Sequence, residues 1–146
     1  MDDDAAADRV RASFARQGAM GLLGAKLARV FPGLVEIALP YREDLAQQHG
    51  FFHGGIVSAV LDSACGYAAL SRMPADRGVL TVEFKISFVA AASGDRLFAR
   101  GRVVKSGRTL VFCDGEALVP AADGERVVAT MTATMMAVHN RPGVQD

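Results

Sequence analysis

The sequence predicts an α+β domain in which one antiparallel sheet curls around a single long helix. Residues 54–72 carry the only long helical pattern, and this segment is apolar on nearly every side. Such a helix is expected to be buried on nearly every side. Four strand patterns follow it with no further helix between them, so a single sheet must cover the helix by curving around it.

The composition is that of one globular domain. The 146 residues are 51% hydrophobic, and Lys+Arg and Asp+Glu are both 16, so the formal net charge is zero. This balance argues against nucleic acid as a partner. Only Cys65 and Cys113 are present, which fits a reducing compartment and excludes a disulfide framework. We see no signal peptide and no run of about 18 apolar residues, so we expect a soluble cytoplasmic protein that does not bind membranes.

Three parts are expected along the chain. Residues 1–20 should form an N-terminal helix, in which Val10 and Phe14 make an apolar i,i+4 pair. Residues 21–139 should form the main domain, and residues 140–146 a flexible tail. The elements predicted before the long helix are a helix over 5–17, extended segments over 24–30 and 33–40 around a Phe-Pro-Gly turn, and a polar loop over 41–52.

Alternation of apolar and polar residues predicts the strands that follow the long helix. They cover residues 81–89, 96–104, 109–119 and 127–138, with turns near Gly94, Gly107 and Gly124. Regular alternation in the first of them places Val82, Phe84, Ile86 and Phe88 on one face and Thr81, Glu83, Lys85 and Ser87 on the other.

The long helix opens on the sequence His53-Gly54-Gly55. These glycines could simply provide a flexible turn before the helix. They could also leave the first amide N–H groups of the helix unobstructed, where the helix dipole adds partial positive charge. Such a terminus can stabilise negative charge that develops on a carbonyl oxygen.

One carboxylate, Asp62, lies inside this apolar helix and is the only charged residue between His53 and Arg72. It could bond a loop or face a polar interface. Because burial of an unpaired carboxylate costs several kcal/mol, it needs either partners or a function. Its position nine residues after His53, in the helix that the two glycines begin, favours a function.

Other chemical groups give weaker signals. His49 and His53 are more simply explained as solvated or capping residues, and Cys65 as a small core residue. Ser58 and Ser63 have neither a nucleophile-elbow motif nor a histidine on their helix face, which argues against a serine hydrolase. The turn Lys105-Ser106-Gly107-Arg108-Thr109 is either a plain exposed hairpin or a phosphate site with two cations and bare amides.

Together these segments resemble the hotdog-fold acyl-CoA thioesterases, in particular the PaaI-like branch. The resemblance runs from about residue 24 to residue 138. It rests on HGG at 53–55, Asp62 nine residues after the histidine, TVEFKISF at 81–88, GD at 94–95 and VVKSGRTLVF at 103–112. It implies a hotdog fold, in which a curved antiparallel sheet wraps a long helix, and subunits that pair into dimers and often into dimers of dimers.

The resemblance further implies hydrolysis of a coenzyme A thioester, with no metal and no cofactor beyond the coenzyme A of the substrate. Asp62 matches the catalytic acid. Gly54, followed by Gly55, matches the residue whose backbone amide polarises the thioester carbonyl. Gln47 falls where the family places Asn or Gln near the carbonyl or the water, and Thr81 falls near a Ser or Thr that helps to hold the water. Residues implied to contact the substrate or its coenzyme A are His53, Gln48, Phe88, Lys105, Ser106, Gly107, Arg108, Thr109 and Leu110. Whether Gln47 or Gln48 points into the site stays open.

The spacing of the two glycines and the acid predicts a shared site. Gly55 and Asp62 are seven residues apart, which is about 10 Å along a helix at about 1.5 Å per residue. A carbonyl held by the glycine amide would lie out of reach of the acid of the same chain. Two antiparallel copies of the helix can supply both groups, so we expect a homodimer as the smallest catalytic unit.

Two other functions remain possible at this point. One is a non-catalytic acyl-CoA-binding or regulatory module on the same fold, against which the retained acid argues. The other is a hotdog dehydratase or hydratase, which would need a catalytic histidine that the long helix lacks. The acyl group cannot be identified, because Phe51, Phe52, Tyr67 and Met73 could line a pocket or simply pack in the core.

Overall fold

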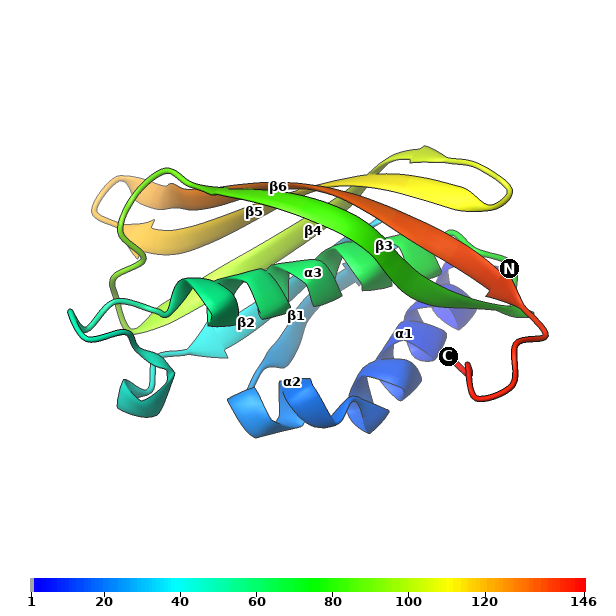
Figure 1. The fold of residues 1–146 in the computed structure, drawn as a ribbon, viewed down its shortest axis with the longest axis horizontal. Helices are drawn as coiled ribbons and strands as arrows, with labels where there is room; N and C mark the ends of the chain where they lie inside the picture. The colour runs from blue at the N-terminus through cyan, green and yellow to red at the C-terminus, as the bar shows by residue number, and fades with distance from the viewer. Residues whose placement is uncertain (1) are drawn as a thin grey trace.

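The computed structural model of the protein describes residues 2–146, and its architecture is a six-stranded antiparallel sheet curved over one long helix (Figure 1). The helices are α1 (Asp3–Arg16), α2 (Gly18–Leu23) and α3 (Gly54–Leu70), with a short 3-10 turn at Glu43–Leu45. The strands are β1 (Lys26–Phe31), β2 (Leu34–Pro40), β3 (Arg77–Phe88), β4 (Arg96–Ser106), β5 (Leu110–Ala121) and β6 (Gly124–His139). They lie in the order β1-β2-β4-β5-β6-β3, so β1 and β3 are the two edges. The sequence-based prediction of a hotdog fold is confirmed.

The predicted elements are all present, with shifted ends. The long helix ends two residues earlier than predicted, at Leu70, and is followed by a turn. The first strand after it begins at Arg77 instead of residue 81, because Arg77 and Gly78 still pair with β6. The predicted N-terminal helix is interrupted: Gln17 has extended backbone angles and separates α1 from α2.

Two facing glycines allow α3 to lie directly against the sheet. Gly101 on β4 is the register partner of Gly115 on β5. A Cβ atom at Gly101 would collide with the backbone of Ala64, and one at Gly115 would lie 3.0 Å from Cys65 Sγ. Their missing side chains therefore bring the helix backbone into contact with the strands, and Ala64 and Cys65 are fully buried there.

One face of α3 is not covered by the sheet, which corrects the expectation that the helix is buried on nearly every side. Val57, Leu61 and Ala68 are fully buried, but Ala59, Asp62, Ser63 and Gly66 remain partly exposed along one face. The physical reason is that the sheet curves without closing, so it covers only the side of the helix toward its concave face (Figure 1). The middle of α3 is thereby open to a ligand or another chain.

The N-terminal helices and the last residues of the chain pack beside the C-terminal half of α3. The ring of Phe14 on α1 lies 5.8 Å from the ring of Tyr67 on α3. Arg9 donates to the carbonyl oxygens of Met73 and Pro74, which follow α3. The side chain of Asp146 accepts a hydrogen bond from the backbone N–H of Val79 at the start of β3. Segments from both ends of the chain thus meet near Asp62.

Candidate active site

Asp62 lies in the middle of α3, half-buried, and its side chain has one hydrogen-bond partner within residues 2–146. Thr81 on β3 donates its hydroxyl to Asp62 Oδ1 at 2.8 Å. Burial raises the pKa of Asp62 above the ordinary value of 3.8, and the Thr81 hydrogen bond opposes this by lowering it. The site therefore combines a carboxylate made more basic by its surroundings with a hydroxyl that orients it.

Thr81 reaches Asp62 because β3 contains a bulge. Thr81 pairs with Met135, whereas Glu83 pairs with Thr134, so Val82 is an extra residue in the strand. Met135 is fully buried toward the helix, and Thr134 on the other face donates to Glu83 Oε1. The regular alternation predicted from the sequence, which placed Thr81 on the face of Glu83, is thus wrong at Thr81, because a bulge adds one residue to the strand.

The first turn of α3 presents one uncapped amide. His53 is the N-cap, and its Nδ1 accepts a hydrogen bond from Gly55 N–H at 2.9 Å. Within residues 2–146, the N–H of Gly54 has no hydrogen-bond acceptor. The capping role predicted for His53 is therefore seen, and of the two predicted amides only that of Gly54 is available to a ligand.

Phe88 marks the same end of the site. Its ring lies against Gly54, where an added Cβ would be 3.1 Å from the ring. Phe88 is 52% exposed although it is a large apolar side chain. The strand β3 thus contacts both chemical groups of α3: Thr81 meets Asp62, and Phe88 meets Gly54.

Gln47 and Gln48 differ in their surroundings. Gln47 is half-buried, and its Oε1 accepts hydrogen bonds from the backbone N–H groups of His49 and Phe51, at 2.5 and 3.3 Å. The Gln47 side chain thereby shapes the loop before His53 and keeps its NH₂ group for another partner. Gln48 is exposed and makes no side-chain hydrogen bond in the described part of the chain.

The predicted phosphate-binding segment is an exposed hairpin tip between β4 and β5. Lys105 and Ser106 still belong to β4, and Gly107 N–H donates to the carbonyl of Leu110 at 2.8 Å. Leu110 pairs with Met136, which in turn pairs with Leu80. The hairpin therefore lies at the end of the sheet where β3 begins, and Leu80, the residue before Thr81, lies two strands away from Leu110.

A small cavity of about 150 Å³ adjoins Asp62 and Thr81. Its other walls include Gln17, Tyr67 and Asp146, and of these three the sequence indicates only Tyr67 as a residue that could line a pocket. No sequence motif could have identified them, because they come from three distant parts of the chain. The one sequence signal for this cavity is Tyr67, which lies five residues after Asp62. We expect Tyr67 either in a pocket or in the core.

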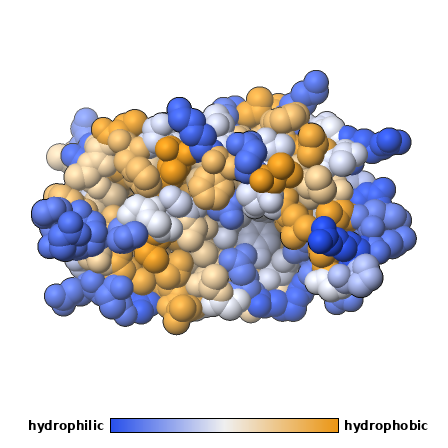
Figure 2. All heavy atoms as spheres, in the orientation of Figure 1, coloured by the Kyte–Doolittle hydropathy of each residue, from blue (hydrophilic) through white to orange (hydrophobic). Residues whose placement is uncertain are grey.

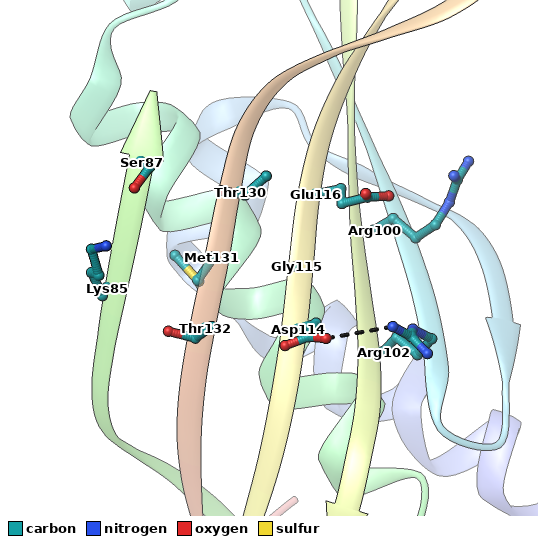
Figure 3. Close-up of a pocket in the computed structure, with 10 residues that line it drawn as sticks. All are labelled: Lys85, Ser87, Arg100, Arg102, Asp114, Gly115, Glu116, Thr130, Met131 and Thr132. Carbon is teal, nitrogen blue, oxygen red and sulfur yellow. Dashed lines mark hydrogen bonds and ion pairs between the residues drawn. The ribbon is translucent and has the colours of Figure 1, made fainter. Parts of the chain in front are cut away.

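A second depression, of about 320 Å³, lies on the other face of the sheet (Figure 3). Its charged residues include Arg100, held by Glu36 at 2.7 Å, and Arg102, held by Asp114 at 3.4 Å. Arg100 and Arg102 alternate with Gly101, which faces α3, so they point away from the helix. None of the predicted site residues lines this depression, and we do not assign it to the reaction.

The described residues offer no place for a metal ion. Residues 2–146 contain no group of three or more His, Cys, Asp or Glu side chains that could hold one. Burial raises the pKa of the Cys65 thiol, so this residue stays a protonated core side chain.

None of the helices in residues 2–146 is long and apolar enough to cross a membrane.

Comparison with known proteins identifies the family. A model of the thioesterase superfamily matches residues 49–120, which include α3 and the hairpin. A Halobacterium salinarum protein, provisionally named an esterase, is 30% identical over 131 residues, or 85% of this chain and 86% of its own. The chain belongs to the thioesterase superfamily.

Solved structures of similar proteins have the same fold. A thioesterase family protein from Silicibacter pomeroyi is 52% identical, with a TM-score of 0.90 over 92% of this chain and 99% of its own. The PaaI protein of E. coli superposes with a TM-score of 0.83 over 93% of this chain and 95% of its own, at 19% identity. Membership of the thioesterase superfamily supports thioester hydrolysis as the general chemistry of this protein.

Proposed function

We propose that this protein hydrolyses acyl-CoA thioesters to a free acid and coenzyme A. In this proposal Asp62 is the base or nucleophile, and the Gly54 amide of a partner subunit polarises the thioester carbonyl. One observation carries it: a single helix holds a carboxylate bonded to Thr81 and, in its first turn, an amide without an acceptor in residues 2–146. These are the two groups that hydrolysis of an activated ester needs.

The distance along the helix supports a site shared between two subunits. Gly54 and Asp62 lie eight residues apart on one continuous helix, which is about 12 Å along its axis. A carbonyl oxygen accepting from the Gly54 amide must lie about 3 Å from that nitrogen, so its carbon is out of reach of Asp62 in the same chain. Two copies related by a twofold axis place the first turn of one α3 beside the middle of the other.

The edge strand β3 is suited to bring two copies together. Its outer side has no neighbouring strand within residues 2–146, and its apolar residues Val82, Phe84 and Phe88 are 50%, 40% and 52% exposed. The view of this side in Figure 2 shows apolar atoms gathered in patches between polar ones. If two β3 strands pair antiparallel about Lys85, the two residues at the bulge, Thr81 and Val82, of one chain lie opposite Phe88 of the other. Asp62 then meets the Gly54 amide of the partner.

The proposed reaction requires Asp62 as the anion. As a base, Asp62 removes a proton from water, the hydroxide adds to the carbonyl carbon, and the C–S bond breaks with return of the proton to the thiolate. As a nucleophile, Asp62 adds to the carbon itself, coenzyme A leaves, and water hydrolyses the resulting anhydride. In both routes the Gly54 amide stabilises the negative oxygen, and the NH₂ of Gln47 is available as a second donor.

Release of free thiol from a panel of acyl-CoA esters tests this function. We expect turnover of at least one ester, and loss of turnover in a folded Asp62→Ala variant. Binding of acyl-CoA without thiol release would contradict the proposal and favour a non-catalytic acyl-CoA-binding module. Water loss from a 3-hydroxyacyl ester would instead identify a dehydratase.

A mixture of two inactive variants tests the shared site. Asp62→Ala removes the acid, and Gly54→Pro removes the amide hydrogen. Proline suits the first helical position, and His53 already has the extended backbone, φ −63° and ψ 134°, that precedes proline. Random mixing makes half of the dimers hybrids, each with one intact site of two, so roughly a quarter of wild-type activity should return on co-refolding. Folded heterodimers without activity would contradict a site shared between subunits.

A further inference from the structure

The cavity beside Asp62 has the size of a small substituent. Its volume is about 150 Å³, and both Asp62 and Thr81 line it. This space is too small for the nucleotide or the pantetheine arm of coenzyme A. If Asp62 acts on a thioester, as proposed above, the part of the substrate that can enter this cavity is the acyl group.

Gln17 gives the cavity a polar wall with free hydrogen-bonding capacity. Its Nε2 donates to the hydroxyl of Tyr67 at 3.0 Å, and its Oε1 accepts from the hydroxyl of Ser63 at 3.1 Å. A side-chain amide has two N–H donors and two lone pairs, so one of each remains for a ligand. Tyr67 is 4% exposed and packs against Phe14. This packing fixes the Tyr67 hydroxyl, which in turn holds the Gln17 amide in place.

The two charged residues that line the cavity are both carboxylates. Besides Asp62, the lining includes Asp146, whose two oxygens accept from Ser13 Oγ at 2.9 Å and from Val79 N–H at 2.7 Å. Two carboxylates around so small a space would repel a carboxylate on the acyl group. The hydrogen-bonding group of a suitable acyl group is therefore uncharged.

Gly66 sets the width of the cavity. It lies four residues after Asp62 on the same face of α3 and lines the cavity. Apart from the adjacent helix backbone, a Cβ at this position would meet no atom of residues 2–146 within 4 Å, so no packing partner in them requires a glycine here. Glycine is an unfavourable residue in the interior of a helix, and at Gly66 its effect is to leave open space next to the carboxylate.

We propose that this cavity is the acyl-group site, and that Gln17 selects a short, uncharged acyl group bearing a hydroxyl. This inference rests on the proposed acyl-CoA hydrolysis. The Gln17 amide donates to or accepts from the substrate hydroxyl, and Gly66 provides the room for a chain of a few carbons. When the acyl group has no hydroxyl, the free N–H and lone pair of Gln17 have no partner on the substrate. Binding of that acyl group in the transition state is therefore weaker.

The test compares kcat/KM for acetyl-, butyryl-, 3-hydroxybutyryl- and succinyl-CoA. We expect 3-hydroxybutyryl-CoA to exceed butyryl-CoA by about tenfold in the wild type, the scale of one hydrogen bond. Succinyl-CoA should be at least about tenfold poorer than 3-hydroxybutyryl-CoA because of the two carboxylates. Gln17→Leu should abolish the preference for the hydroxylated ester.

Gly66→Ala provides a second variant, which keeps the helix and adds one methyl group to the cavity. It should lower the ratio of kcat/KM for butyryl-CoA over acetyl-CoA by about threefold or more, as expected for a pocket narrowed by one methyl group. Gly21→Ala on α2, where an added Cβ also meets no atom within 4 Å, is the matched control and should leave all ratios unchanged.

Two results would overturn the inference in different ways. If acyl-CoA esters are hydrolysed but the ratios are the same in the wild type, Gln17→Leu and Gly66→Ala, the cavity does not bind the acyl group and the proposed activity stands. If the folded wild-type protein hydrolyses none of the four esters, nor any other acyl-CoA, both the proposed function and this inference are wrong.

Discussion

The first turn of α3 and its middle differ in what supplies the chemical group. In the first turn the group is the backbone N–H of Gly54, which has no acceptor within residues 2–146 because His53 caps Gly55 instead. In the middle it is the Asp62 side chain, whose pKa is raised by burial and lowered by its bond to Thr81. Almost any residue has an N–H, so at Gly54 the space beside Phe88 limits substitution. At Asp62 the ionisation of the side chain matters most. The two positions should therefore respond to substitution in different ways.

Replacement of the acid should have the largest effect. We expect Asp62→Asn to lower kcat by at least about a hundredfold, within the roughly 10²–10⁴ range of a positioned acid–base group. Because burial raises the pKa of Asp62, its anion destabilises the fold as pH rises through that pKa. The folded variant should therefore be at least as stable as the wild type at pH 7. Below pH 3.8, the ordinary pKa of an aspartate, the carboxyl is protonated in both the folded and the unfolded chain, and the two proteins should be equally stable. Thermal unfolding at both pH values and thiol release measure these effects. Near-normal turnover would remove Asp62 from the mechanism.

Removal of the amide hydrogen at Gly54 should have a smaller but comparable effect. Gly54→Pro should lower kcat by about 10²–10³, the cost of losing one donor to a developing oxyanion. Gly54→Ala is the control, because it adds the same Cβ, 3.1 Å from the Phe88 ring, but keeps the N–H. The alanine variant should retain most of its activity. Equal losses in both variants would show that crowding of Phe88, and not the amide, explains the effect.

The cations of the hairpin lie outside both regions and should affect binding alone. Replacing Lys105 and Arg108 with alanine should raise KM for acyl-CoA by about tenfold, on the scale of a lost charge-assisted hydrogen bond. Hydrolysis of a short pantetheine thioester, which lacks the nucleotide phosphates, should not change. An equal effect on both substrates would contradict a role in phosphate binding.

The smallest effect is expected at Thr81. Thr81→Val removes the hydrogen bond that lowers the pKa of Asp62, so that pKa should rise further. Since the reaction needs the anion, the acid limb of the kcat profile should move to higher pH, while the plateau falls by less than about tenfold. Thr81→Ser keeps the hydroxyl and should retain the wild-type profile. A pH profile unchanged in the valine variant would exclude Thr81 as a partner of the reactive carboxylate.

The sequence predicts the parts of the site that lie close together along the chain. Gly54 and Asp62 belong to one helix with a glycine start and a solitary charge, so helical spacing alone relates them. The curved sheet follows from the same helix and from the alternation of the later strands. Both predictions depend on local periodicity, which a single sequence contains.

The remaining parts depend on long-range packing, which a single sequence does not contain. Gln17, Tyr67 and Asp146 meet only because α1, α3 and the last residues of the chain pack on one another. Nothing in the local pattern separates Gln17 from a residue on the surface of a helix. Thr81 was placed on the wrong face by alternation, because a bulge is a property of the pairing of β3 with β6.

The bulge at Val82 makes the site sensitive to whether a change in the length of β3 adds a residue to the bulge or removes one. Each residue before the bulge lies on the face opposite to the one that regular pairing would give it. A single insertion between Thr81 and Glu83 would shift each residue before the bulge by one pairing position and turn Leu80 or its neighbour toward Asp62. Deletion of Val82 would remove the extra residue and leave Thr81 facing the carboxylate. Length changes of one residue at this point thus differ in their consequences for the reaction, although no side chain named in the mechanism is altered.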